Sequence, residues 1–211
     1  MVQIDPTPAA SSPKAQDRRA EILRRAAAVF REKGFHGAGM REIAAGLGMA
    51  PGALYYYFKS KEDLLYACQD ISLTRLIEHA TEVLARAEPA DVLLHALIAA
   101  HLDLTLDELG GSAAHVEFHA LPEEKLRSIV AKRDEYEGLI RTLMRRGIRA
   151  GTFRKVDVKL TTLALLGALN WSVVWFNPEG RWSPPDLVRG FADVFVDGLR
   201  ASHPHTKEAP Q

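Results

Sequence analysis

Hydrophobic residues recur along this chain at intervals of three and four positions, the spacing that places them on one face of an α-helix. No segment shows the strict alternation of apolar and polar residues that predicts a β-strand. The pattern therefore predicts an all-α fold. The expected helices cover residues 17–33, 40–47, 51–58, 61–87, 89–109, 112–120, 122–150, 156–176 and 184–201.

The helical patterns divide into a small N-terminal domain and a larger C-terminal one. Residues 1–16 and 202–211 have no periodicity and are rich in small, polar or Pro residues, so we expect both tails to be disordered. Residues 17–66 hold the shortest helices, which are too small to bury a core alone. The start of the 61–87 helix should complete that core, and residues 67–201 should form the second domain.

Residues 39–58 contain two short helical patterns joined by a turn. Gly48 stands where a sharp turn needs a positive φ, and two short helices joined in this way describe a helix-turn-helix. Pro51 suits the first turn of the second helix, where its missing N–H is no loss. Ser60 and Asp63 form a capping-box-like start to the following helix. The second short helix should point its N-terminal end into the major groove of DNA.

Side chains in and after this motif are candidates for two kinds of DNA contact. Phosphate contacts, which position a protein on the duplex, are predicted for Arg41, Tyr55, Tyr57, Lys59 and Lys61. Base contacts are predicted for Pro51, Gly52, Ala53 and Tyr56. Ala53 would touch a thymine methyl group, and Tyr56 would offer its hydroxyl or ring to a base edge. Core packing remains an alternative role for Tyr55 and Tyr57.

The charge distribution adds to this picture. The whole chain has 27 Lys or Arg and 27 Asp or Glu, which gives a formal net charge of zero. Residues 14–66, however, hold ten Lys or Arg against six acids, so the N-terminal part carries +4 and the rest −4. This polarity suits a molecule with one end that meets phosphate, although ordinary solvated helix faces would also produce it.

The N-terminal motif resembles the DNA-binding signature of the tetracycline-repressor (TetR) family over about residues 18–66. The residues that carry the resemblance are Phe35, Ile43, Ala44, Gly48, Gly52, Leu54, Tyr55, Tyr57, Phe58, Lys61, Glu62, Leu64 and Leu65. It implies an all-helical homodimer with three DNA-binding helices and a C-terminal domain that binds a small ligand and dimerises. The chain departs from the family at Gly39 and Ala50, where a hydroxyl residue is common, and at Ala53, where Thr is common. The operator sequence therefore cannot be taken from a relative.

Residues 156–176 are apolar nearly all round, which predicts a helix buried on several sides. Together with the amphipathic residues 184–201, this helix should form a four-helix dimer interface, as the last two helices do in the family. A plain core helix is the alternative. In the family such a dimer sets its two reading helices about 34 Å apart, which predicts a palindromic operator. We expect no membrane-spanning run, no secretion signal and a cytoplasmic location.

A ligand site is predicted at the polar and aromatic interruptions of this apolar helix. Asn170, Trp171 and Trp175 would line an apolar pocket, or would equally pack the dimer. Residues 169–182 resemble the corresponding region of TetR-type regulators that respond to acyl-CoA thioesters. Arg145 and Arg149 would then bind the CoA phosphates, unless they are part of a solvated helix face. The ligand is thus either an acyl-CoA thioester or an unesterified hydrophobic compound.

Other chemistry has little support in the sequence. His115 and His119 stand four residues apart, a possible metal pair, but the pattern lacks the glutamate of zinc protease motifs, and we predict no metal. The single cysteine, Cys68, is expected to pack in a core rather than sense oxidants. No nucleophile elbow, phosphate-binding loop or dinucleotide fingerprint is present, so we expect neither an enzyme nor a cofactor. The prediction is a ligand-released repressor; a constitutive architectural DNA-binding dimer is the alternative.

Overall fold

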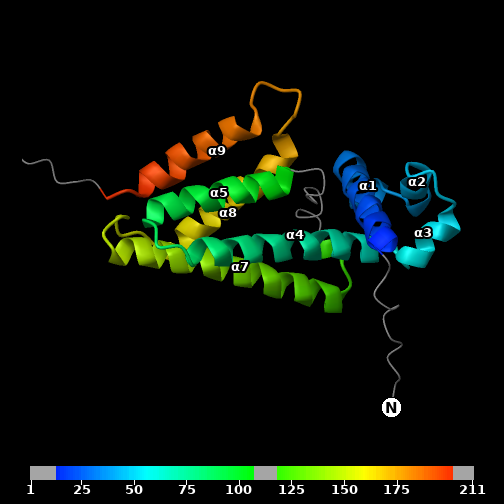
Figure 1. Ribbon diagram of the computed structural model, residues 1–211, viewed down its shortest axis with the longest axis horizontal. Helices are drawn as coiled ribbons and strands as arrows, with labels where there is room; N and C mark the ends of the chain where they lie inside the picture. The colour runs from blue at the N-terminus through cyan, green and yellow to red at the C-terminus, as the bar shows by residue number, and fades with distance from the viewer. Residues whose placement is uncertain (1–12, 107–117, 202–211) are drawn as a thin grey trace, which may run out of the picture.

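The computed structural model describes residues 13–106 and 118–201, and every regular element within these ranges is helical (Figure 1). Three N-terminal helices, α1 (Pro13–Gly37), α2 (Met40–Ala45) and α3 (Pro51–Tyr57), form a small head at one end of the molecule. The long helix α4 (Lys61–Leu84) runs from this head into a second group of helices. The all-α prediction is therefore confirmed.

The first helix is longer than the sequence pattern predicts. It begins at Pro13, so residues 13–16 are helical rather than part of a disordered tail, and proline fits a first turn without loss of a hydrogen bond. The helical segment also continues to Gly37, across a kink at Gly34, whose φ of 70° is accessible to glycine at little cost.

The head and the start of α4 share one apolar core. Its fully buried members come from all four helices, and include Ile22, Ala26 and Phe30 of α1, Ile43 and Ala44 of α2, Leu54 of α3, and Leu64 and Leu65 of α4. The cap of α4 is as predicted, because the Asp63 backbone N–H donates to the Ser60 side-chain oxygen over 3.1 Å. Any movement of α4 therefore carries the head with it.

The remaining helices form the C-terminal domain. They are α5 (Ala90–Leu106), α7 (Glu123–Arg149), α8 (Val158–Trp175) and α9 (Pro184–Ala192), with a 3₁₀ turn, η1 (Phe118–Ala120), before α7 and a π-helical turn, η2 (Asp193–Asp197), after α9. The predicted helix 112–120 falls mostly outside the described residues, which show only η1. The predicted helix 184–201 changes to the π-helical turn at Asp193, and its end is tied to the turn after α7, where Arg154 N–H donates to the Leu199 carbonyl over 2.9 Å.

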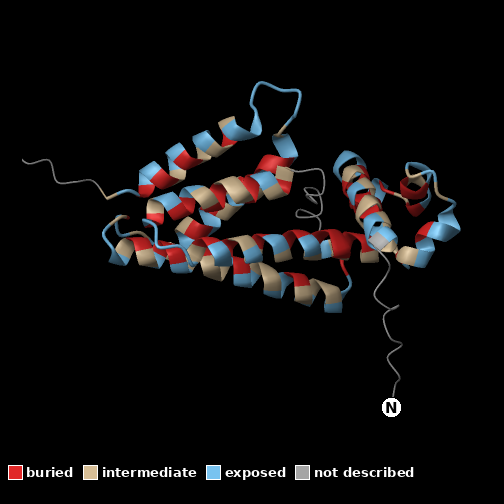
Figure 2. Ribbon diagram, in the orientation of Figure 1, coloured by how far each residue is buried: buried red, intermediate tan, exposed pale blue. Residues whose placement is uncertain are grey.

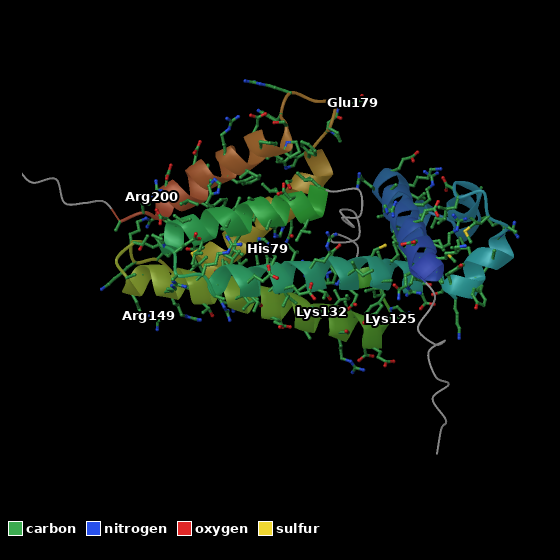
Figure 3. All side chains as sticks on the ribbon, viewed as in Figure 1. His79, Lys125, Lys132, Arg149, Glu179 and Arg200 are labelled. Atoms are coloured by element: carbon green, nitrogen blue, oxygen red, sulfur yellow. The ribbon has the colours of Figure 1, made fainter. Side chains whose placement is uncertain are left out.

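Helices α4 and α7 run parallel and are joined by polar pairs at a constant offset of 62 residues. Lys125 pairs with Asp63, the Ser128 and Tyr66 hydroxyls lie 3.3 Å apart, and Lys132 pairs with Asp70. Both lysines are labelled along α7 in Figure 3. Figure 2 shows buried positions along most of α4, whereas much of α3 is exposed. Helix α4 is thus the central support of the molecule, and α3 lies at its surface.

Candidate DNA-binding surface and ligand cavity

The first turn of α3 is exposed and carries no long polar side chain. Gly48, with a φ of 62°, makes the turn from α2, as predicted. Pro51, Gly52 and Ala53 are all exposed, and Ala50 precedes them without a side-chain cap. This end of the helix therefore presents backbone, a methyl group and a proline ring to any partner.

The three consecutive tyrosines of α3 occupy different environments. Tyr56 is 81% exposed and Tyr55 is 47% exposed, whereas Tyr57 is half-buried against the head core. The rings of Tyr56 and Tyr57 meet edge to face, with centroids 5.4 Å apart. Tyr57 therefore supports the outward position of Tyr56, which is free to reach a base edge or a phosphate.

The three cations predicted for phosphate contact, Arg41, Lys59 and Lys61, do not behave alike. Arg41, in the first turn of α2, and Lys59, just after α3, are both exposed, as a phosphate contact requires. Lys61 is turned inward: its Nζ donates to the carbonyls of Phe35 and Ala38 over 2.6 and 3.0 Å and lies 4.3 Å from the Phe35 ring. The prediction of Lys61 as a phosphate ligand is therefore corrected, because its ammonium group holds the end of α1.

Other cations of the head also serve its internal structure. Arg18 donates to the Leu47 carbonyl over 3.2 Å, and Arg19 donates to the Tyr57 carbonyl over 3.4 Å with its guanidinium 4.2 Å from the Phe58 ring. These contacts tie α1 to the turn between α2 and α3 and to the C-terminal end of α3. Sequence reasoning missed them because each spans 29 residues or more. Part of the excess positive charge is therefore committed within the head.

The C-terminal domain contains a cavity of about 310 Å³ between α4, α5, α7 and α8. Four leucines give it apolar walls, namely Leu73, Leu76, Leu163 and Leu166. Its polar side chains are His101, Arg133, Asp134, Tyr136, Glu137 and Asn170. Asn170 thus lies where the sequence predicted a ligand site. The cavity wall includes α4, the helix that carries the head.

The predicted arginines are not at this cavity. Arg145 and Arg149 are exposed farther along α7, and Figure 3 labels Arg149 at the far end of that helix. Arg146, between them in the sequence, donates to the carbonyls of Leu84, Arg86 and Glu88, each over 3.2 Å. The cation at the cavity is Arg133, which stacks 4.3 Å from the Phe118 ring and whose pKa is lowered by burial. Sequence periodicity could not tell these arginines apart.

A buried polar pair forms part of the cavity wall. His101 of α5 is 1% exposed and Tyr136 of α7 is 4% exposed. The His101 Nδ1 and Tyr136 Oη atoms lie 3.1 Å apart, and the two rings are stacked. Burial raises the pKa of the Tyr136 hydroxyl, so it stays protonated. Sequence analysis did not predict either residue as a ligand contact; His101 stood out only as a histidine near the possible metal pair, and Tyr136 belongs to no recognisable motif.

The two tryptophans predicted at the pocket point elsewhere. Trp171 and Trp175 are 56% and 45% exposed on α8, and the Trp175 ring meets that of Trp182 edge to face. An apolar groove of about 500 Å³ adjoins Trp175; it is lined mainly by Ala168, Trp175, Trp182, Leu187, Phe191, Val194 and Phe195. The alternative that these tryptophans pack a dimer is therefore favoured over a place in the cavity.

Helix α8 is long and apolar enough, by length and composition alone, to cross a membrane, contrary to the sequence prediction. Only 28% of its residues are buried within the chain. A single helix of this kind says little about a membrane by itself, because core helices of water-soluble proteins pass the same test. Ala168 and Trp175 of α8 line the apolar groove together with α9.

The remaining candidates from the sequence are the possible histidine pair and the single cysteine. His115 lies outside the described residues, and His119 stacks on Phe118 with ring centroids 4.0 Å apart. Within residues 13–106 and 118–201, no group of three His, Cys, Asp or Glu side chains is placed to hold a metal ion. Cys68 is buried in the head core, and burial raises the pKa of its thiol to about 12. A packing role for Cys68 follows.

A helix-turn-helix head joined through one long helix to a helical domain with an internal cavity defines a ligand-responsive DNA-binding regulator. Comparison with known families agrees with this class. Residues 22–68 match the family described as bacterial regulatory proteins, tetR family, and residues 87–199 match the tetracyclin repressor-like C-terminal domain. The chain belongs to the TetR family of transcriptional regulators, as its N-terminal motif predicted.

Individual relatives agree along nearly the whole chain. The transcriptional repressor KstR2 of Rhodococcus jostii is 26% identical over 95% of this chain and 100% of its own length. The crystal structure of PfmR from Thermus thermophilus is 32% identical, with a TM-score of 0.77 over 85% of this chain and 98% of PfmR. AibR, in a structure with isovaleryl coenzyme A and operator DNA, is 26% identical to this chain. Its TM-score is 0.75, and the match covers 85% of this chain and 98% of the AibR chain.

Proposed function

We propose that this protein is a homodimeric repressor that binds a palindromic operator and leaves it when an acyl-CoA thioester fills the C-terminal cavity. The observation that carries the proposal is the place of α4, which contributes Leu64 and Leu65 to the head core and Leu73 and Leu76 to the cavity wall. One rigid element therefore touches both sites.

The DNA side of the proposal rests on α3 and its neighbours. The exposed first turn, with Pro51, Gly52 and Ala53, enters the major groove, and Tyr56 extends from the next turn. Phosphates are contacted by Arg41 of α2, by Tyr55 and Tyr57 of α3, and by Lys59 just after α3. The reading surface is small and mostly apolar, so thymine methyl groups are its natural targets.

The dimer forms through the exposed apolar face of α8 and α9. Trp171, Val174, Trp175, Trp182 and Val194 are each at least 45% exposed in one chain, a cluster that monomeric proteins rarely leave in water. A second copy that covers this face buries both sets of side chains around a two-fold axis. Two-fold symmetry in the protein then requires a palindromic site in the DNA.

Ligand binding would act on α4 through the cavity. A ligand shifts the equilibrium between two head arrangements only if it binds one of them more tightly. Because the cavity lies between α4 and the α5, α7 and α8 helices, filling it changes the position that α4 prefers. The ligand must favour a spacing of the two heads that does not fit the operator.

The ligand class is inferred from the cavity and from one relative. AibR, which is similar in fold and sequence, has been crystallised with isovaleryl coenzyme A. The cavity here has leucine walls for an acyl group and Arg133 as a cation near it. Its volume is at the low end of the range of about 300–1,000 Å³ for ligand pockets, which favours a short or medium acyl chain. An unesterified hydrophobic compound is the second candidate, because Arg145 and Arg149 lie away from the cavity.

Operator release is the experiment that tests this function. A binding site is first selected from random DNA with the purified protein, and fluorescence anisotropy then follows release from that DNA as acyl-CoA thioesters or the matching free acids are added. Release by thioesters alone supports the proposal, and release by free acids moves the ligand to unesterified compounds. DNA held in the presence of every compound would instead favour the architectural dimer.

A further inference from the structure

We propose that the buried His101–Tyr136 pair is the hydrogen-bonding site for the carbonyl oxygen of the ligand's acyl group. The inference rests on the proposed function, because it takes the cavity as the effector site. Beyond the ligand class, the inference names the ligand atom that is recognised, the carbonyl oxygen, and the two residues that recognise it.

The geometry leaves the tyrosine hydroxyl with one unused hydrogen-bonding function. Its oxygen lies 3.1 Å from His101 Nδ1, and the two residues come from different helices, α5 and α7, that meet at the cavity. When His101 carries its proton on Nδ1, it donates to the tyrosine oxygen, and the tyrosine O–H is left to donate to a ligand. A donor that itself accepts a hydrogen bond is polarised and becomes stronger.

A carbonyl acceptor fits this donor better than other groups do. An acyl thioester offers acceptors but no donors next to its chain, so it matches a hydroxyl that donates. The same wall carries Asp134 and Glu137, and each faces a cation: Asp134 acts on Arg133, and Glu137 pairs with Arg141 over 3.1 Å. The wall therefore has no excess positive charge to attract a free carboxylate ligand. The neutral carbonyl of a thioester needs no such charge, and its chain packs on the leucines.

Burial of the Tyr136 hydroxyl is a second reason to expect a hydrogen-bond acceptor on the ligand. Tyr136 is 4% exposed, so water reaches its hydroxyl poorly except through the cavity. A buried donor without an acceptor is costly, and a ligand that supplies one gains the corresponding free energy on binding. Ligands that lack the carbonyl leave the donor unsatisfied and should bind more weakly.

Isothermal titration of the full-length dimer tests the inference with three probes. The first is the acyl-CoA thioester that binds most tightly in a series of short and medium chains. The second is the S-alkyl-CoA thioether of the same chain, in which the carbonyl is replaced by a methylene group, and the third is the free acid. We expect the wild-type protein to bind the thioester about tenfold more tightly than the thioether, the effect of one neutral hydrogen bond.

Two single-atom variants assign this preference to the pair. Tyr136→Phe should bring the thioester and thioether affinities to within about twofold of each other. Tyr66→Phe is the matched control. It also removes a tyrosine hydroxyl that contacts another side chain, Ser128, but Tyr66 lies outside the cavity. This variant should bind the thioester about tenfold more tightly than the thioether, as the wild-type protein does. Because the two probes are first compared on the wild-type protein, the inference is tested even if Tyr136→Phe fails to fold.

The outcomes separate the inference from the proposed function. Equal binding of thioester and thioether by the wild-type protein would overturn the carbonyl site while leaving an acyl-CoA response in place. A preference that survives Tyr136→Phe would also overturn it. Free acid that binds as well as the thioester, with the thioether weak, would support the carbonyl site and contradict the CoA proposal. Binding of none of the three would overturn both.

Discussion

The molecule exposes aromatic side chains in two places, and their surroundings give the two surfaces different roles. On α3, Tyr55 and Tyr56 stand beside Arg41 and Lys59 and next to an open helix end. On α8 and in the segment between α8 and α9, three tryptophans are exposed near Val174 and Val194 and an apolar groove. Tyrosines among cations suit the charged backbone of DNA, whereas tryptophans among valines suit a protein surface of the same kind.

Exposure of an aromatic residue does not by itself identify its partner. Both surfaces expose large rings to a similar degree, and the neighbouring charges distinguish them. The dimer surface should respond most strongly to an introduced charge, and the DNA surface to loss of a side chain.

Val194→Glu should disrupt the dimer. Val194 is 66% exposed and lines the α8–α9 groove, so a second copy would bury the new carboxylate among tryptophans and phenylalanines. An unpaired buried charge costs several kcal/mol, about 3–5. Sedimentation equilibrium should show monomers, and operator affinity should fall at least about 100-fold. Val130→Glu, on the exposed face of α7, is the control and should remain dimeric; monomers from both variants would refute the specific role of the groove.

Tyr56→Ala should weaken operator binding by about 10- to 100-fold without changing the dimer, because each of two half-sites loses a base contact of about 1 kcal/mol or more. Anisotropy with the selected operator measures the affinity, and size-exclusion chromatography checks the dimer. Tyr56→Phe separates the two possible contacts. Affinity retained in Tyr56→Phe indicates that the ring is read, and affinity lost indicates the hydroxyl; an unchanged Tyr56→Ala would contradict the docking of α3.

Lys59→Ala and Lys61→Ala should separate a phosphate contact from an internal support. Lys59 is exposed beside α3, so its loss should reduce the salt dependence of binding by about one ion for each subunit and leave thermal stability unchanged. Lys61 donates to two carbonyls of the α1 end, so its loss should lower the free energy of unfolding by about 2 kcal/mol. The reverse assignment of the two effects would restore Lys61 to the DNA surface.

The smallest effect concerns acid stability at the α4–α7 junction. Burial alone would raise the pKa of Asp63, but the ion pair with Lys125 and the hydrogen bonds with Ser60 outweigh it, and the pKa lies below its ordinary 3.8. A carboxylate with a lowered folded-state pKa stabilises the fold above about pH 4, and this contribution is lost as the pH falls through the folded-state pKa.

Asp63→Asn should therefore lower the melting temperature at pH 7 and reduce its further fall between about pH 4 and pH 2. Thermal denaturation at a series of pH values measures both. Asp103→Asn, at an exposed position of α5, serves as the control. If the melting temperature of Asp63→Asn falls as steeply with decreasing pH as that of the wild-type protein, the Asp63–Lys125 pair does not contribute to the acid dependence of stability.

Local patterns predicted most of the helices and the DNA-binding motif, because the information for both is short-range. The turn at Gly48, the start of α3 at Pro51 and the cap of α4 at Ser60 each depend on residues within a few positions. The same reasoning failed at helix ends such as Pro13, where the helix begins earlier than its periodicity predicts, and Asp193, where the helix type changes.

The fold class, the helix-turn-helix and the family follow from the order of residues, since they depend on spacing along one helix or one turn. Which cation serves which purpose depends instead on contacts formed in the folded molecule. Lys61 turns to carbonyls more than 20 residues away, and Arg133 rather than Arg145 or Arg149 reaches the cavity. Folding also brings His101 and Tyr136 together across 35 residues of chain. Hydrogen bonds and cavities depend on distances in space, which periodicity along the chain does not encode.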